Sequence, residues 1–290
     1  MDVFLQQTLS GLATGAIYAL MALAIVMIYQ AIDHFNFAQG EMAMFSTFMA
    51  WQMLQWGMPF WLAFVVCIVL SFAGGLAIER LVFGPIRGAP VLSHVIVFMA
   101  LFSIFNSLAG FIWGFTIKPF PSPFPAKMGI ETTLISAHEL GMILVTLLML
   151  GLIYLFFRFT PIGLAMRAAA VNPESARLVG INVTWMLGLG WGLSAAVGAV
   201  AGMLIAPIVF LEPNMMVGIL VYGFAGAVVG GLTSPGGAVV GGFLMGLVEN
   251  LAGTFIIGTE LKLTFALVII IAVLLVRPSG LFGRVVVSRV

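Results

Sequence analysis

Six polar side chains lie in or beside the long apolar stretches of this 290-residue sequence. Amide and carboxylate groups of this kind can bind a small zwitterionic solute through hydrogen bonds and charge. They can equally bond one another or the backbone, which locks helices together or holds a bend. The residue types leave both interpretations open. The six candidates are Asn36, Gln39, Glu41, Asn106, Glu249 and Asn250.

The other reactive side chains form no recognisable catalytic or metal-binding set. The three histidines, His34, His94 and His138, are far apart and lack the spacing of metal ligands. The single cysteine, Cys67, lies in an apolar run and is typical of a small buried residue. A Gly-x-x-x-x-Gly-Lys-Ser/Thr phosphate loop is absent, so ATP is not expected to bind this chain by that route. We expect neither enzymatic activity nor a cofactor or metal on the chain itself.

Composition indicates what surrounds the elements that carry these residues. Hydrophobic residues make up 62% of the chain and charged residues only 7%, with a mean hydropathy of +1.22. A soluble domain carries about 25% charged residues, so this chain cannot cover its surface in water. The net charge of +1 gives no indication of nucleic-acid binding. Most of the surface is therefore expected to face membrane lipid.

The hydropathy pattern predicts an all-α, polytopic membrane protein with eight or nine membrane-spanning or re-entrant helices. A spanning helix needs about 20 apolar residues. The segments at 42–56 and 216–232 are short, which is typical of broken or re-entrant helices. The apolar segments are residues 8–29, 42–56, 60–78, 91–115, 140–157, 183–210, 216–232, 235–257 and 261–276.

Basic residues predict the orientation of the loops, because cytoplasmic loops are enriched in Lys and Arg. The loop at 158–182 and the C-terminus are expected in the cytoplasm, and the Pro-rich loop at 116–139 outside it. Eight crossings or nine place the N-terminus on opposite sides, and the sequence leaves that choice open. The basic residues used are Arg80, Arg87, Arg158, Arg167, Arg177, Arg277, Arg284 and Arg289.

Glycines recur at helical spacing near the C-terminal end of the chain. The hexapeptide Gly-Ala-Val-Val-Gly-Gly occurs at 226–231 and again at 237–242. Small residues four positions apart let helix backbones approach closely in lipid. The pattern predicts tight helix packing, and it is also compatible with helices that line a path. The glycines concerned are Gly226, Gly230, Gly237, Gly241, Gly242 and Gly246.

The loop at 158–182 contains a short helix with its own start and stop signals. Asn172 can cap it, Pro173 suits its first turn and Glu174 suits its positive end. Arg177 lies toward the negative end and Gly180 can end the helix, so residues 173–179 are predicted to be helical. A short helix with apolar residues such as Ala176 is typical of a docking site for another protein. A helix lying on lipid head groups is the alternative.

Three stretches resemble the permeases of ABC importers for branched-chain amino acids, specifically the H-type half. The first runs from Arg167 to Asn182 and is similar to the loop that couples these permeases to their ATPase. The second joins Gly-Ala-Ile-Tyr-Ala-Leu at 15–20 to Asn-Phe-Ala-Gln-Gly-Glu at 36–41. The third is the Gly-rich segment at 230–242, followed by Glu249. The chain departs from the family pattern at Gln39, at Thr233 and in the Pro-rich loop at 119–125.

The resemblance implies one transmembrane permease domain over residues 1–290 in a bacterial inner membrane. It implies four kinds of contact partner: a second related permease subunit, two ATP-binding subunits that hold ATP and Mg, a periplasmic substrate-binding protein, and lipid. The implied substrates are branched-chain amino acids or related small polar solutes such as urea, amides and carboxylates. The loop at 158–182 would contact the ATPase through Arg167, Asn172, Pro173, Glu174, Ala176, Arg177 and Gly180.

A self-contained channel or secondary carrier is the competing hypothesis. It would use Glu41 or Glu249 as an intramembrane proton or ion site. The predicted docking helix at 173–179 disfavours it, because an autonomous carrier has no need of such a helix.

Overall fold

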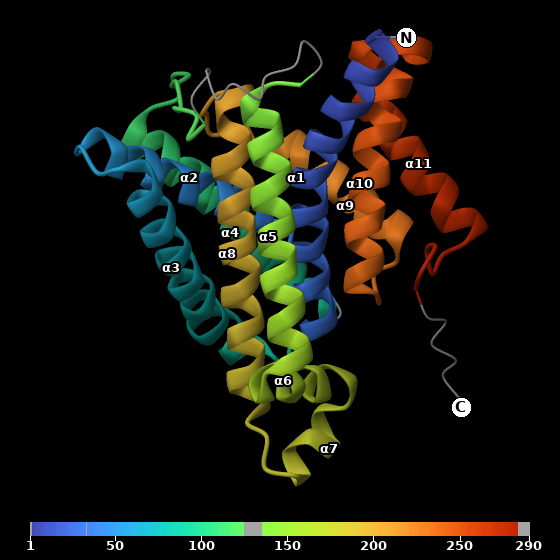
Figure 1. Ribbon diagram of the computed structural model, residues 1–290. Coiled ribbons are helices and arrows are strands. Elements are labelled where there is room, and N and C mark those ends of the chain that lie inside the picture. The colour runs from blue at the N-terminus through green and yellow to red at the C-terminus, as the bar shows by residue number, and fades with distance from the viewer. Residues whose placement is uncertain (1, 33, 125–134, 284–290) are drawn as a thin grey trace. The chain divides into compact units, whose positions relative to one another are not determined.

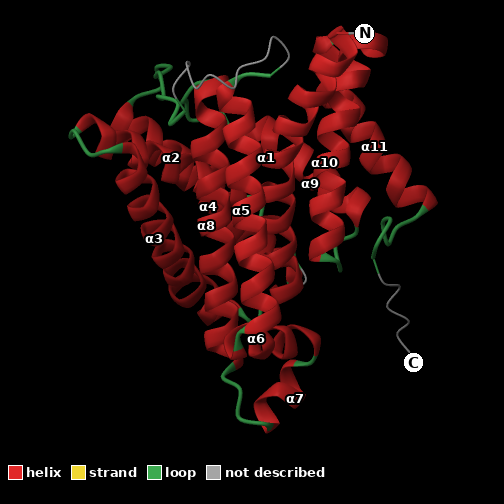
Figure 2. Cartoon of the chain, viewed as in Figure 1, coloured by secondary structure: helices red, strands yellow, loops and turns green. Residues whose placement is uncertain are grey.

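The fold of the described residues is entirely helical, as the sequence predicts. The computed structural model describes residues 2–32, 34–124 and 135–283. Figure 2 shows helices joined by loops, and Lys118 and Leu211 form an isolated β-bridge between two of these loops. The predicted loop at 116–139 and the predicted cytoplasmic C-terminus fall partly outside the described residues.

Seven helices of the described part of the chain are long and apolar enough to cross a membrane. Three of them are extended by turns of another helix type: α3 by a π-helical turn at Glu79–Phe83 and a 3₁₀ turn at Gly84–Ile86, α10 by a π-helical turn at Gly253–Ile257, and α11 by a preceding 3₁₀ turn at Thr259–Leu261. Their regular parts are α1 (Asp2–Ile32), α3 (Phe60–Ile78), α4 (Val91–Trp113), α5 (Ala137–Phe159), α8 (Val183–Val209), α10 (Pro235–Ala252) and α11 (Lys262–Val276).

Two further helices are shorter than a spanning helix requires. They are α2 (Gln39–Gln55), of 17 residues, and α9 (Val217–Gly230), of 14 residues. Both coincide with the segments predicted to be short. With the seven long helices they account for the predicted eight or nine segments, so the polytopic all-α prediction is confirmed.

The described residues divide into two compact units, and the division falls inside α1 and inside α5. The first unit holds residues 2–26, 122–124, 135–144 and 217–283, and the second holds 27–32, 34–121 and 145–216. In the first unit, α9, α10 and α11 share a core that includes Ala225, Met245 and Ile270. The single permease domain inferred from sequence stays a prediction.

Helix α8 is the centre of the second unit because its small residues let neighbouring backbones come close. A methyl group on Gly202 would lie 2.9 Å from the carbonyl oxygen of Ala43 in α2. On the other side, a methyl group on Gly75 of α3 would lie 2.6 Å from the carbonyl oxygen of Trp191. The fully buried Trp191 ring packs on Phe83, with ring centroids 4.6 Å apart. These contacts place α2 and α3 directly against α8.

Two short helices complete the second unit. They are α6 (Pro161–Val171) and α7 (Pro173–Leu178), and in Figure 1 both lie beyond one end of α8. Thr160 caps α6 by accepting a hydrogen bond from the amide of Gly163 at 2.9 Å. The sequence analysis treated this stretch as an irregular polar loop and missed α6, although Thr160-Pro161 is a helix-start signal.

Candidate transport path and docking helix

Two of the predicted polar residues hold the bend that precedes α2. Asn36 accepts a hydrogen bond from the amide of Ala38 at 3.0 Å and donates one to Gln39 at 3.2 Å. Gln39 donates to the carbonyl oxygen of Ser194 in α8 at 3.1 Å and accepts from the Ser194 hydroxyl at 3.2 Å. Both side chains are buried and bonded to protein atoms. Their geometry therefore fits a structural role, the alternative that the sequence left open.

Glu41 and Asn106 come together although 65 residues separate them. The Asn106 amide nitrogen donates to a carboxylate oxygen of Glu41 at 3.4 Å. The same nitrogen lies 3.0 Å from the carbonyl oxygen of Pro213 and 3.1 Å from the side-chain oxygen of Asn214. Glu41 is 1% exposed, whereas Asn214 is exposed. Sequence reasoning missed Asn214 because it read the segment after α8 only as a helix end.

Glu249 and Asn250 share a partner that the sequence analysis did not select. The Lys262 ammonium nitrogen lies 2.9 Å from a carboxylate oxygen of Glu249 and donates to the Asn250 side-chain oxygen at 3.2 Å. The Tyr18 hydroxyl donates to the other Glu249 oxygen at 3.2 Å, and its ring stacks on Tyr222. Every oxygen of this carboxylate therefore has a partner inside the first unit. The signal that could have revealed Lys262 is a lone cation at the start of an apolar helix.

The helix predicted at residues 173–179 is observed as α7, and its docking role stays a prediction. The Asn172 side chain accepts a hydrogen bond from the amide of Ser175 at 2.9 Å, and Gly180 ends the turn with a φ of +85°. Ala176 is buried against Ala169 of α6 and Val183 of α8. The other face is open: Leu178 is 88% exposed and Val179 is 76% exposed, and Glu174 and Arg177 are exposed as well. An apolar, locally folded projection of this kind fits a protein contact.

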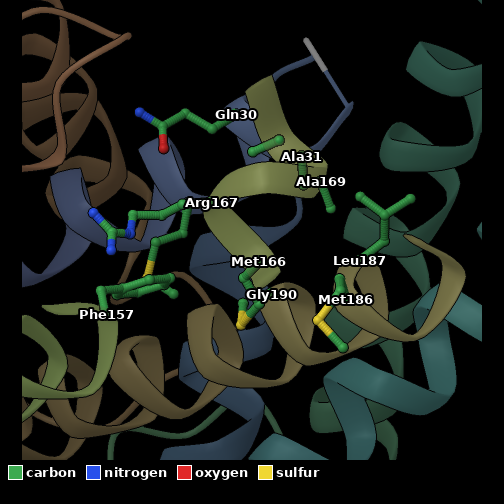
Figure 3. Close-up of a pocket in the computed structure, with 11 residues that line it drawn as sticks. Gln30, Ala31, Phe157, Met166, Arg167, Ala169, Met186, Leu187 and Gly190 are labelled. Carbon is green, nitrogen blue, oxygen red and sulfur yellow. The ribbon is translucent and has the colours of Figure 1, made fainter. Parts of the chain in front are cut away.

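Arg167 lies apart from the other predicted coupling residues, on α6 rather than α7. It lines a cavity of about 50 Å³ together with residues of α1, α5 and α8. In Figure 3 the side chains of Gln30 and Arg167 point toward the same side of this cavity. Most of the remaining lining is apolar, including Met166, Met186 and Leu187.

A polar clamp fastens the end of α3 to the first turn of α8, directly after α7. Arg87 forms an ion pair with the buried Glu79 and donates to the Thr184 hydroxyl at 2.8 Å. The Arg80 guanidinium lies 4.0 Å from the centroid of the Trp185 ring, a cation–π contact. The sequence analysis used these arginines only for orientation. No local pattern reveals the clamp, because its two halves are about a hundred residues apart in sequence.

The predicted packing glycines bring α9, α10 and α1 into close contact within the first unit. A methyl group on Gly226 of α9 would lie 2.7 Å from the Cα of Gly242 in α10. A methyl group on Gly246 would lie 2.3 Å from the Cα of Gly15 in α1. Gly230, Gly237 and Gly241 show backbone approaches equally close. Side chains larger than hydrogen would separate these helices.

The described residues contain no cluster of three or more His, Cys, Asp or Glu side chains that could hold a metal ion. The arrangement can bind and orient a polar solute and can dock a partner protein.

Comparison with known proteins agrees with this picture. A family described as the permease component of the branched-chain amino acid transport system matches residues 7–274. The high-affinity branched-chain amino acid transport permease LivH of Escherichia coli K12 is 30% identical, covering 99% of this chain and 98% of LivH. BraD, the corresponding permease of Pseudomonas aeruginosa, shows the same identity and coverage. A probable LivH of Methanocaldococcus jannaschii is 31% identical over 91% of this chain and 88% of its own length.

A solved structure shares the fold. The chain is similar to a chain of PsaBC from Streptococcus pneumoniae in complex with Fab, with a TM-score of 0.51 and 12% sequence identity, over 93% of this chain and 91% of that one. At that identity the likeness concerns the fold alone. The sequence relatives say more, because they align from end to end and share the family match. On these grounds the chain belongs to the family of permease components of branched-chain amino acid transport systems.

Proposed function

We propose that this chain is the membrane-spanning subunit of an ATP-driven, binding-protein-dependent importer. Its substrates would be branched-chain amino acids or related small polar solutes. Partner subunits would hydrolyse ATP with Mg, a second related permease subunit would complete the path, and a periplasmic protein would deliver the solute. Family membership and the transport of branched-chain amino acids by LivH and BraD support the proposal. We place the chain in the bacterial inner membrane with its C-terminus in the cytoplasm.

The observation that carries the proposal is the projection formed by α7. A two-turn helix with its own cap exposes Leu178 and Val179 to water or to another protein. Isolated helices this short are marginal in water, so its cap and its contact with α6 and α8 are what maintain it. A chain that transports alone gains nothing from such a helix. We infer that it inserts into the ATPase subunit, and that residues 158–182 form the coupling loop.

Substitutions in α7 test this assignment. Glu174→Arg reverses the charge at the helix start, and Gly180→Trp forces a bulky side chain into a left-handed backbone conformation. In proteoliposomes holding the whole transporter, we expect each variant to insert normally but to lower ATP-driven uptake about tenfold or more, as expected when a docking contact is lost. Co-purification of the ATPase subunits reports the docking itself.

Glu260→Arg is the matched control, because it also reverses an exposed carboxylate but lies outside the coupling loop. It should leave both uptake and co-purification unchanged. Normal uptake in both α7 variants would contradict the proposal that α7 docks on the ATPase subunit. Transport by the purified chain alone, with no ATPase present, would overturn the proposed function itself.

A further inference from the structure

Glu41 is a buried carboxylate that has no counter-charge among the described residues. Its side chain is 1% exposed, and among the described residues its single side-chain hydrogen bond comes from Asn106 at 3.4 Å. The other buried carboxylates differ, since Glu249 pairs with Lys262 and Glu79 pairs with Arg87. Burial of an unpaired charge is strongly unfavourable. The position of Glu41 in the first turn of α2 offsets only a small part of that cost.

Asn106, the hydrogen-bond partner of Glu41, has more acceptors nearby than hydrogens to donate. The amide nitrogen of Asn106 carries two hydrogens but lies within hydrogen-bonding distance of three oxygens, those of Glu41, Pro213 and Asn214. The Glu41 contact is the longest of the three and hence the weakest. The Glu41 carboxylate can therefore accept a stronger hydrogen bond from another donor. Asn106 links this carboxylate to Asn214, which is exposed.

Aromatic rings continue from Glu41 along the face that α2 turns toward α4. Phe45 lies one helical turn after Glu41, and its ring is 5.4 Å from Phe105 and 5.3 Å from Trp113. These three rings are half-buried rather than closed off. Phe105 directly precedes Asn106 in α4, and Phe45 follows Glu41 in α2, so the rings belong to the same two helices as the amide and the carboxylate.

The chemistry of this site selects one class of cation. A carboxylate beside ring faces favours an organic ammonium, whose charge bonds the oxygens and whose neighbouring carbons contact the rings. A metal ion would require several oxygen, nitrogen or sulfur ligands. The described residues hold no group of three or more His, Cys, Asp or Glu side chains that could bind a metal ion, at Glu41 or elsewhere.

We propose, on the basis of the function proposed above, that Glu41 binds the ammonium group of the transported solute. The rings of Phe45, Phe105 and Trp113 receive its apolar side chain. When the solute is absent, the Asn106 amide donates a hydrogen bond to the Glu41 carboxylate. When the ammonium group takes that place, the amide donates only to the oxygens of Pro213 and Asn214. The substrate class is thus a primary ammonium with an apolar substituent, and not a neutral amide such as urea.

Uptake by the complete transporter tests the assignment. We expect Glu41→Gln to lower uptake of radiolabelled leucine about tenfold or more, the loss typical of one charge-assisted hydrogen bond. ATP hydrolysis stimulated by the leucine-loaded binding protein should stay within about twofold, because the variant leaves the α7 contact intact. Glu41→Asp keeps the charge and should restore part of the uptake. Glu212→Gln, which removes a half-buried carboxylate from the nearby segment after α8, should change neither readout.

A binding measurement without substitutions keeps the proposal testable if Glu41→Gln fails to fold. Isopentylammonium should raise the unfolding temperature of the wild-type transporter, whereas isocaproate, which carries a carboxylate on the same carbon skeleton, should not. Absence of stabilisation by isopentylammonium would overturn the proposal, as would normal leucine uptake in Glu41→Gln. Parallel loss of uptake and stimulated hydrolysis in both Glu41 variants would show a structural role and overturn it too. If the wild-type transporter shows no ATP-driven uptake, the proposed importer function is wrong, whatever the role of Glu41.

Discussion

At the scale of single residues, three buried polar side chains of this chain are bonded in three different ways. Gln39 bonds only amide and hydroxyl groups and the backbone of the same unit. Glu249 is neutralised by Lys262 and by the Tyr18 hydroxyl. Glu41 has one long hydrogen bond and no cation among the described residues. Ion-paired Glu249 is a poor candidate for a proton or ion carrier, because its oxygens are already engaged.

The pair between Glu249 and Lys262 gives a prediction about stability. Lys262→Met keeps the side-chain stem that packs on Gly253 but removes the charge. We expect it to destabilise the protein by about 3–5 kcal/mol, because it leaves Glu249 buried and unpaired. Thermal unfolding in detergent measures the loss. The double variant Glu249→Gln/Lys262→Met should recover most of it, and a double variant as unstable as the single one would contradict the pairing.

At the scale of elements, small residues decide which helices can pack together. In the first unit α10 presents glycines to both α9 and α1, so it is held on two sides at backbone contact. In the second unit α8 does the same for α2 and α3. The short helices α6 and α7 depend instead on caps: Thr160 and Asn172 each accept a hydrogen bond from a backbone amide at the start of the helix.

Two glycines of α10 provide a matched test of this packing. A methyl group on Gly242 would lie 2.4 Å from the Cα of Ala19, whereas one on Gly236 would meet nothing within 4 Å. Gly242→Ala should therefore destabilise the protein by about 1–3 kcal/mol through overpacking. Gly236→Ala should be neutral or slightly stabilising, since Ala favours helix over Gly by up to about 1 kcal/mol. Thermal unfolding compares the two, and equal stabilities would contradict close contact between α10 and α1.

At the scale of the whole molecule, the chain is a multi-pass membrane protein whose charged residues gather at helix ends and loops. Arg158, Arg167 and Arg177 lie in or beside α6 and α7, at one end of the second unit (Figure 1). Basic residues mark cytoplasmic loops. This distribution supports a cytoplasmic position for α7, where a soluble ATPase subunit could reach it.

Labelling with a membrane-impermeant maleimide tests that orientation in intact cells. Thr116→Cys and Ser175→Cys are both exposed, and the native Cys67 is fully buried and gives little background. We expect Thr116→Cys to react in intact cells and Ser175→Cys to react only after the membrane is permeabilised. The reverse pattern would invert the proposed topology, and labelling of both positions in intact cells would exclude α7 from the cytoplasm.

The sequence by itself determined the features that depend on neighbouring residues. Hydropathy predicted α3 at the residues where it is observed and identified α2 and α9 as short. The capping residues predicted the position of α7. These features are local, because helix hydrogen bonds and caps join residues three or four positions apart. The family resemblance added the transport class.

Tertiary structure alone decided which distant side chains meet. Glu41 and Asn106 are 65 residues apart in sequence, and Gln39 and Ser194 are 155 apart. Tyr18 and Glu249 are 231 apart. Such pairings depend on which faces of the helices pack together and in what register, and a run of apolar residues leaves both undetermined. In the folded chain the six polar candidates therefore fall into three groups: a bend held by hydrogen bonds, an ion pair, and a carboxylate with no counter-charge in the part of the chain that the structure describes.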